Sequence, residues 1–254
     1  MTVRYEGEGP VVVVTIDRPD ARNAVDRPTA DALADAFRRF DADASLSVAI
    51  LTGAGGTFCA GADLKAIGTE RGNRVDRAGD GPMGPTRMLL EKPVIAAIEG
   101  HAVAGGLELA CFCDLRVVAE DATLGVFCRR FGVPLIDGGT VRLPRIVGLG
   151  RALDLILTGR AVTAAEAFAM GLATKITPPG KTLEAARELA MAIAALPQTC
   201  MREDRLATYE GLSLDLPEAL ENELLHGEIS LAAPELATML TAFASGAGRH
   251  GGKL

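Results

Sequence analysis

Apolar positions along the chain follow two periods, and each period predicts one kind of element. Short β-branched runs predict buried strands, which we expect over 11–17, 47–52, 94–98, 115–119 and 174–177. A spacing of three and four residues predicts a helix over 28–40, because Leu33, Phe37 and Phe40 then fall on one face. A helix is also expected in GGLELACFCDL (105–115). Strands that alternate with helices in this way predict an α/β fold.

Helical patterns fill the rest of the chain. Gly148 and Gly159 punctuate helices over 139–147 and 150–157, and Thr163 with Glu166 forms a capping box. Further helices are predicted over 182–195, 199–211, 216–230 and 233–246. We therefore expect a core over residues 1–195 and a helical C-terminal region over residues 196–254.

One stretch fits neither period. GTERGNRVDRAGDGPMGP (68–85) is polar and glycine-rich, and its charges have mixed signs. Such a composition cannot bury much apolar surface, so it predicts a loop, and a mobile one.

Composition narrows the function classes. Hydrophobic residues make up 48% of 254 residues, and no apolar run is long enough to span a membrane. The net charge of -7 does not predict a nucleic-acid partner. An odd number of cysteines (5) without a secretory signal at the N-terminus predicts a reducing cytoplasm, and no metal site is expected because CxxC pairs are missing.

Three common catalytic or nucleotide-binding motifs do not occur. Gly53 and Gly55 open a GxGxxG-like stretch, but Phe58 stands where the third glycine would fall. Neither a phosphate-binding GxxxxGK[ST] nor a GxSxG nucleophile turn is present. A dinucleotide enzyme, a P-loop nucleotidase and a serine hydrolase are therefore not predicted.

Two loops have the residues of an anion site. FCAGADLKAI (58–67) and EGHAVAGGLELACFCDL (99–115) each pass small residues and then start a helix, the second with Gly105-Gly106 at its entrance. The first amides of a helix lack internal partners, and small residues let a ligand approach them. Two such loops facing each other would bind an anionic oxygen, whereas each alone could be an ordinary corner.

Glu108 is the candidate acid or base. It lies one turn into a helix made otherwise of Leu107, Leu109, Ala110 and similar apolar residues. A carboxylate buried there must be paired or functional, because leaving it unpaired is costly. Burial would raise its pKa, as proton transfer near neutral pH requires.

Several motifs in order resemble the enoyl-CoA hydratase/isomerase family, the crotonases. They are IDRPDARNAV (16–25), FCAGADL (58–64), KPVIAAIEGHAVAGGLELACFCDLRVVAEDATLG (92–125) and GGTVRLPRIVGLGRALDLILTGRAVTAAEAFAMGLATKI (138–176). The resemblance implies a spiral of ββα turns with a helical C-terminal region that mediates trimerisation. It also implies a cytoplasmic homotrimer or homohexamer that acts on acyl-CoA thioesters, as in fatty acid metabolism, without a cofactor beyond the coenzyme A of the substrate.

The resemblance also implies roles for single residues. The amides of Ala62 and Gly105 would form an oxyanion hole for the thioester oxygen, and Glu108 would be an acid or base. Contacts with the acyl group or coenzyme A are implied for Arg22, Ala24, Ala60, Asp63, Leu64, Gly106, Cys128, Phe243 and Lys253.

The second carboxylate of hydratases is missing from its place. Counted without gaps from Glu108, the family's second glutamate falls at Cys128. Asp137, in the turn LIDGGT (135–140), is the candidate substitute, since aspartates there take part in chemistry in relatives that make a naphthoate ring or remove aromatic halides. Asp137 could instead cap the helix that follows. Cys128 could itself react if Arg129 and Arg130 favoured its thiolate, or be a small buried wall residue.

We expect an acyl-CoA enzyme that stabilises a thioester enolate, with hydration of a 2-enoyl-CoA as the named activity. Glu108 and Asp137 would be its catalytic pair. Other crotonase reactions remain alternatives: double-bond isomerisation, C–C bond cleavage and thioester hydrolysis. A protein that binds acyl-CoA without turnover is the alternative outside the enzyme class. One arginine of the Arg129-Arg130 pair would contact a substrate carboxylate or Asp137, or both would be surface residues.

Overall fold

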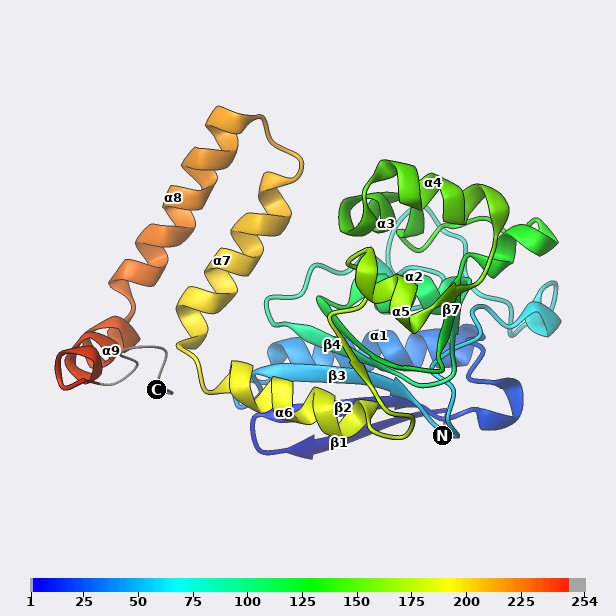
Figure 1. The fold of residues 1–254 in the computed structure, drawn as a ribbon, viewed down its shortest axis with the longest axis horizontal. Coiled ribbons are helices and arrows are strands. Elements are labelled where there is room, and N and C mark those ends of the chain that lie inside the picture. Colours follow the sequence, from blue (N-terminus) through cyan, green and yellow to red (C-terminus); the bar gives the residue numbers. More distant parts are fainter. Residues whose placement is uncertain (1, 247–254) are drawn as a thin grey trace. The chain divides into compact units, whose positions relative to one another are not determined.

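Six strands form the main sheet, in the order β1-β2-β3-β4-β6-β9, and Figure 1 labels the first four of them. They are β1 (Val3–Glu8), β2 (Val11–Ile16), β3 (Val48–Gly53), β4 (Val94–Ile98), β6 (Leu115–Ala119) and β9 (Lys175–Thr177). β1 pairs antiparallel with β2, and the other neighbours pair in parallel. The central strands are continuous apolar runs because parallel strands are covered on both faces. The computed structural model describes residues 2–246.

A second, smaller sheet turns the chain into a spiral. Its strands are β5 (His101–Val103), β7 (Thr123–Gly125) and β8 (Val162–Thr163), in the order β5-β7-β8. β4 of the main sheet leads into β5 and then into helix α2, and β6 leads into β7 and then towards helix α3. Each turn of the chain thus visits the main sheet, the small sheet and a helix. This is the ββα spiral that the family resemblance implied.

Helices connect or follow the strands in the first part of the chain. They are α1 (Arg27–Ala42), α2 (Gly105–Phe112), α3 (Gly139–Val147), α4 (Leu149–Thr158), α5 (Ala164–Ala169) and α6 (Thr182–Ala194). The Asp26 side chain caps α1 by accepting a hydrogen bond from the Thr29 amide at 3.2 Å. Short 3₁₀ turns lie at Pro19–Ala21, Leu64–Ala66, Pro85–Arg87 and Phe127–Phe131.

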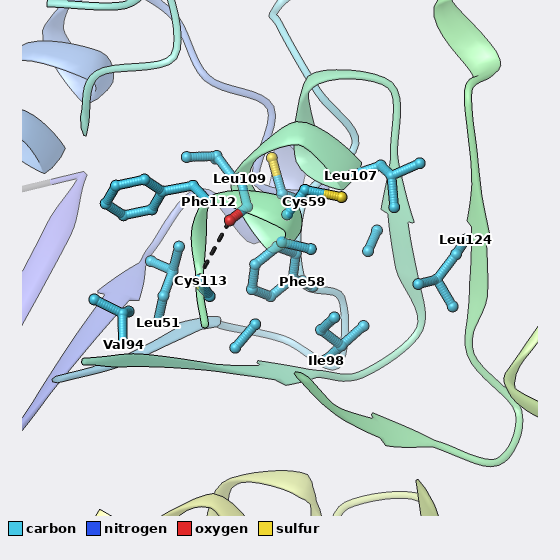
Figure 2. Packing of buried hydrophobic residues seen from close by; sticks show 14 of the residues in the cluster. Leu51, Phe58, Cys59, Val94, Ile98, Leu107, Leu109, Phe112, Cys113 and Leu124 are labelled. Atoms are coloured by element: carbon cyan, nitrogen blue, oxygen red, sulfur yellow. Dashed lines mark hydrogen bonds between the residues drawn. The ribbon is translucent and has the colours of Figure 1, made fainter. Parts of the chain in front are cut away.

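Helix α2 lies at the centre of the apolar core. Figure 2 shows Leu109 and Phe112 of this helix packed over Val94 and Leu51 of the main sheet. The ring of Phe112 also meets that of Phe37 from α1 edge to face, with centroids 5.4 Å apart. Such packing holds the short helix rigidly, and Glu108 is carried on it.

Contacts along the chain divide it into two compact units, Met1–Met191 and Ala192–Leu254. The second unit contains α7 (Gln198–Gly211), α8 (Leu216–Ala232) and α9 (Pro234–Ala244), and α7 packs along α8. His226 of α8 lies between Glu203 and Glu210 of α7, at 2.6 and 3.0 Å. The division falls inside α6, close to the boundary after residue 195 that the sequence predicted; the trimerisation role of this region stays a prediction.

Candidate active site

Two loops meet at the entrance of helix α2. Cys59 pairs with the small sheet: its amide donates to the His101 carbonyl at 2.8 Å, and its carbonyl accepts from the Val103 amide at 3.1 Å. A Cβ on Gly106 would lie 2.1 Å from that same Cys59 carbonyl oxygen, so only glycine allows this approach. The first turn of α2 is therefore fixed against the loop that begins at Phe58.

The backbone at the entrance of α2 is strained. Ala104 has φ 54° and ψ −126°, in a region that side chains other than glycine rarely occupy. This turn directs the chain from β5 into α2 within a single residue. Strain of this kind persists only where the surroundings impose it, and here it sets the direction of the Gly105 amide.

The amides of Ala62 and Gly105 line one cavity. Neither amide donates a hydrogen bond to any group in residues 2–246, although the groups on either side of Ala62 are paired: the Gly61 carbonyl accepts from the Val25 amide at 2.8 Å, and the Asp63 amide donates to the Val25 carbonyl at 2.9 Å. A Cβ on Gly61 would lie 3.0 Å from the Gly105 nitrogen, so the two loops are in contact. Two residues whose amides have no partner among the described residues thus lie on the wall of one cavity.

Glu108 reaches the same cavity from the first turn of α2 and is 3% exposed. Its Oε1 accepts hydrogen bonds from the amides of Asp137 at 2.9 Å and Gly139 at 2.8 Å. Its Oε2 has no partner among the described residues. Burial raises the pKa of Glu108 to about 7, against the lowering effect of the Gly139 amide and with a further raising effect of Asp137. The sequence predicted that a buried Glu108 carboxylate must be paired or functional. Its hydrogen-bond partners are two backbone amides and not a cation.

Asp137 is the second buried carboxylate of the cavity. Its Oδ1 accepts from the Met83 amide at 2.9 Å and from the Thr86 hydroxyl at 2.5 Å, while Oδ2 has no partner in the described part of the chain. Burial raises its pKa, and the Thr86 and Met83 hydrogen bonds oppose that effect. The alternative that Asp137 caps α3 is wrong, because the N-cap is Gly138 and receives no side-chain hydrogen bond.

Cys128 lies on the cavity wall and is buried. Burial, followed by the nearby Glu108 carboxylate, raises the pKa of its thiol, so the thiolate is disfavoured. The adjacent arginines point elsewhere: Arg129 Nε donates to the Ile156 carbonyl at 3.0 Å and Arg130 Nε to the Gly159 carbonyl at 3.1 Å. Neither of them pairs with Asp137, so of the alternatives for these two arginines the pair with Asp137 is wrong.

The cavity has a volume of about 530 Å³, within the range of small-molecule pockets. Among the described residues that line it, the ionisable carboxylates are Glu108 and Asp137, and Asn73 adds an amide. The rest of its wall is small or apolar. It is formed by Ala60, Ala62, Leu64, Ile67, Gly68, Gly72, Val75, Pro82, Met83, Val103, Ala104, Gly105, Phe127, Cys128, Phe131, Gly132, Val133, Pro134 and Ile136.

Other residues that the sequence singled out lie in several places. Ala60 and Leu64 are on the cavity wall, whereas buried Gly106 contacts the Cys59 carbonyl. Asp63 caps the turn at 64–66 and forms an ion pair with Arg18 at 3.0 Å.

Ala24 is buried, and Arg22 is exposed, with its carbonyl bonded to the Ala60 amide at 3.1 Å. Exposed Phe243 belongs to α9 of the second unit, and Lys253 lies outside the described residues. Their roles with coenzyme A stay predictions.

The residues that hold Asp137 could not be identified from the sequence. Gly81 and Met83 come from the end of the stretch predicted to be a mobile loop (68–85), and Thr86 follows it directly; a Cβ on Gly81 would lie 2.8 Å from Asp137 Oδ1. Arg142 of α3 donates to the carbonyls of Asp137 at 3.2 Å and Thr86 at 2.8 Å. This end of the stretch is therefore docked on the site. Gly81 was the one residue that could have indicated this close contact, but a glycine in a loop does not reveal which distant residue it contacts.

Gly106→Ala tests the contact between the two loops. The added methyl group would lie 2.1 Å from the Cys59 carbonyl oxygen, so the loops must separate, and overpacking of this kind costs about 1–3 kcal/mol of unfolding free energy. Denaturant unfolding measures this loss. The matched control is Gly150→Ala in α4, where an added Cβ meets nothing within 4 Å and should be neutral or stabilising by about 1 kcal/mol. Equal stabilities for the two variants would contradict the tight contact.

Known proteins are similar to this chain in sequence and fold. Residues 6–232 match the enoyl-CoA hydratase/isomerase family. Enoyl-CoA hydratase EchA19 of Mycobacterium tuberculosis is 43% identical over 197 residues, covering 75% of this chain and 73% of that protein. Carnitinyl-CoA dehydratase of Salmonella arizonae is 36% identical over 92% of this chain and 94% of its own length. The crystal structure of enoyl-CoA hydratase EchA1 from Mycobacterium marinum superposes with a TM-score of 0.91 at 37% identity, covering 96% of each chain.

The chain therefore belongs to the enoyl-CoA hydratase/isomerase family, as its motifs predicted, and it has the crotonase fold. An acyl-CoA thioester is the substrate class consistent with this family. Within residues 2–246, no helix has the length and apolar character to cross a membrane.

Proposed function

We propose that the protein catalyses the reversible addition of water to the 2,3 double bond of an enoyl-CoA thioester. One observation carries the proposal: two buried carboxylates, Glu108 and Asp137, share one largely apolar cavity, and each has one oxygen held by hydrogen bonds and the other unpartnered among the described residues. The held oxygens orient the two groups. The unpartnered oxygens are available to exchange protons with a ligand.

The amides of Ala62 and Gly105 supply the electrostatic part of the reaction. Both line the cavity that contains the two carboxylates, and neither has a partner in the described chain. In the proposed complex they donate to the thioester oxygen, which becomes negative as the enolate forms. Removing one donor of this kind typically costs about 3 kcal/mol in the barrier. The Gly105 amide has the additional advantage of lying at the positive end of α2.

In the proposed hydration, one carboxylate accepts a proton and the other carboxyl group donates one. In hydration, water adds its oxygen to the β-carbon and gives a proton to the ionised carboxylate, and the protonated carboxyl group donates a proton to the α-carbon of the enolate. The pair must therefore start with one proton between them. Burial raises both pKa values, that of Glu108 to about 7, which favours a singly protonated pair near neutral pH. The pair ends each cycle with one proton again.

In this proposal Asp137, and not Cys128, is the second group that transfers a proton. A hydratase needs a second group that both loses and gains a proton near neutral pH, and burial raises the already high pKa of the Cys128 thiol. Cys128 is therefore a small wall residue in the proposal. The names of two relatives, an enoyl-CoA hydratase and a carnitinyl-CoA dehydratase, describe addition and removal of water, and this further supports the reaction class. The homotrimer or homohexamer and the cytoplasmic location stay predictions.

The test follows the conjugated thioester absorbance of crotonyl-CoA and longer 2-enoyl-CoAs. We expect this absorbance to fall as water adds, and the product to be a 3-hydroxyacyl-CoA by mass spectrometry. Absence of turnover at every chain length would overturn the hydratase proposal and leave the family and fold unchanged. Release of free thiol or migration of the double bond would instead identify thioester hydrolysis or isomerisation.

A further inference from the structure

The rim of the cavity carries large apolar side chains that are exposed. Ile67 is 63% exposed, Val75 71% and Phe131 71%, and all three line the same cavity as the catalytic carboxylates. They come from two segments far apart in the sequence, the stretch after the turn at Leu64–Ala66 and the turn Phe127–Phe131. Large apolar residues gathered at one opening are a feature of binding surfaces, because single exposed ones are normally scattered.

The charges of the cavity select against an anionic acyl group. Its described lining contains no lysine, arginine or histidine, whereas Glu108 and Asp137 are both acidic. The amide of Asn73 is already engaged, since its Nδ2 donates to the Pro82 carbonyl at 2.7 Å. A carboxylate on the acyl chain would lose its hydration without gaining a cation, and burying an unpaired charge is costly.

The position of the reactive carbons determines which part of a substrate meets the rim. In the proposed function the thioester oxygen lies at the Ala62 and Gly105 amides, and the α- and β-carbons lie between Glu108 and Asp137. A crotonyl group ends one carbon beyond the β-carbon. Covering the exposed apolar rim therefore requires an acyl group that continues further.

We infer that the substrate of this site is a 2-enoyl-CoA with an apolar acyl group that carries no anionic group, extends well beyond the β-carbon and packs against Phe131 and Val75. The inference rests on the proposed function for the position of the reactive carbons. The observation behind it is an exposed apolar rim around a cavity whose described lining contains no basic side chain, and this observation does not depend on which reaction the carboxylates perform.

The experiment compares kcat/KM for enoyl-CoAs of about four, eight and twelve carbons and for glutaconyl-CoA, whose acyl group ends in a carboxylate. Each methylene buried against the rim should raise kcat/KM about fourfold until the apolar surface is covered, from about 0.8 kcal/mol per methylene. We expect glutaconyl-CoA to be the poorest substrate. Values that are flat or fall with chain length would overturn the inference.

Substitution at the rim makes the test specific. Phe131→Ala and Val75→Ala should each reduce the ratio of kcat/KM between the long and the four-carbon substrate, by about tenfold for Phe131→Ala. The matched control is Phe168→Ala in α5, where the phenylalanine is 54% exposed but does not line the cavity; it should leave the ratio unchanged. Equal losses at all chain lengths would mean that the rim contacts the coenzyme A arm. A change in oligomeric state on gel filtration would mean that a second copy covers it. Either outcome overturns the inference.

A binding measurement separates this inference from the proposed function. Butyryl-, octanoyl- and dodecanoyl-CoA cannot be hydrated, and calorimetry gives their dissociation constants without turnover. Tighter binding of the longer acyl groups, reduced in Phe131→Ala, supports the inference even if no enoyl-CoA is hydrated. Hydration of crotonyl-CoA without any dependence of binding on chain length would overturn the inference and support the proposed function.

Discussion

Glu108→Gln lowers kcat of enoyl-CoA hydration by about 10²–10⁴-fold in our expectation, the contribution typical of one group in general acid–base catalysis. Glutamine retains the Oε1 acceptor for the amides of Asp137 and Gly139, so the site keeps its geometry. The variant loses the proton-exchanging oxygen alone. Stopped-flow or steady-state absorbance with an enoyl-CoA measures the change, and activity within about threefold of the parent protein would remove Glu108 from the mechanism.

Stability against pH provides the folding control for this variant. Burial raises the pKa of Glu108 from 4.5 to about 7, so the parent protein loses stability relative to Glu108→Gln as the pH rises from about 4.5 through about 7. The two proteins should differ little below that window. Above it the glutamine variant should be more stable by about 3 kcal/mol, since each unit of pKa shift corresponds to about 1.4 kcal/mol. Denaturant unfolding at pH 4.5 and pH 8 measures the difference, and an opposite sign would contradict the raised pKa.

Asp137→Asn should reduce kcat by a similar factor of about 10²–10⁴, because it removes the second proton-exchanging oxygen. Asparagine keeps an Oδ1 acceptor for the Met83 amide and the Thr86 hydroxyl, so the docked turn stays in place. The matched control is Thr86→Val, which removes one hydrogen bond to Asp137 and leaves its carboxylate. We expect this control to cost about 1 kcal/mol of stability and less than about tenfold in kcat.

The pair of variants separates chemistry from structure at Asp137. If the aspartate only anchors the turn that contains Met83, Thr86→Val and Asp137→Asn should have comparable effects on stability and activity. If it carries a proton, activity falls steeply in Asp137→Asn while both variants remain folded. Full activity of Asp137→Asn would leave Glu108 as the sole carboxylate with a catalytic role.

Long apolar runs made the main sheet predictable. β2, β3, β4 and β6 are buried strands whose sequences are almost entirely apolar, and their predicted ranges agree with the structure within about one residue. The small sheet was not predicted, because strands of two or three residues such as β8 have no readable period. β1 was also missed, since five of its six positions are not buried and its sequence mixes charged residues with glycine.

The candidate site was predictable where it depends on local chemistry. A carboxylate within an apolar helix indicated Glu108, and glycines at a helix entrance indicated Gly105. The hydrogen-bond partners of Asp137 were not predictable, because the Thr86 hydroxyl and the Asp137 carboxylate are separated by 51 positions along the chain. The mixed charges and glycines of residues 68–85 hid the fact that the segment's end docks on Asp137. Contacts of this range depend on the tertiary arrangement.

Glu108 also has a consequence for anyone who wishes to redesign this enzyme. The oxygen that accepts from the Gly139 amide serves as the missing acceptor at the start of α3, so in the proposed mechanism one side chain belongs both to the reaction and to the scaffold. Replacing it by alanine would strand two buried amides, each at a cost of about 1–3 kcal/mol. New chemistry at this position must therefore come from a residue that still offers an acceptor atom there, which restricts the practical choices for a redesigned active site to glutamine and its close relatives.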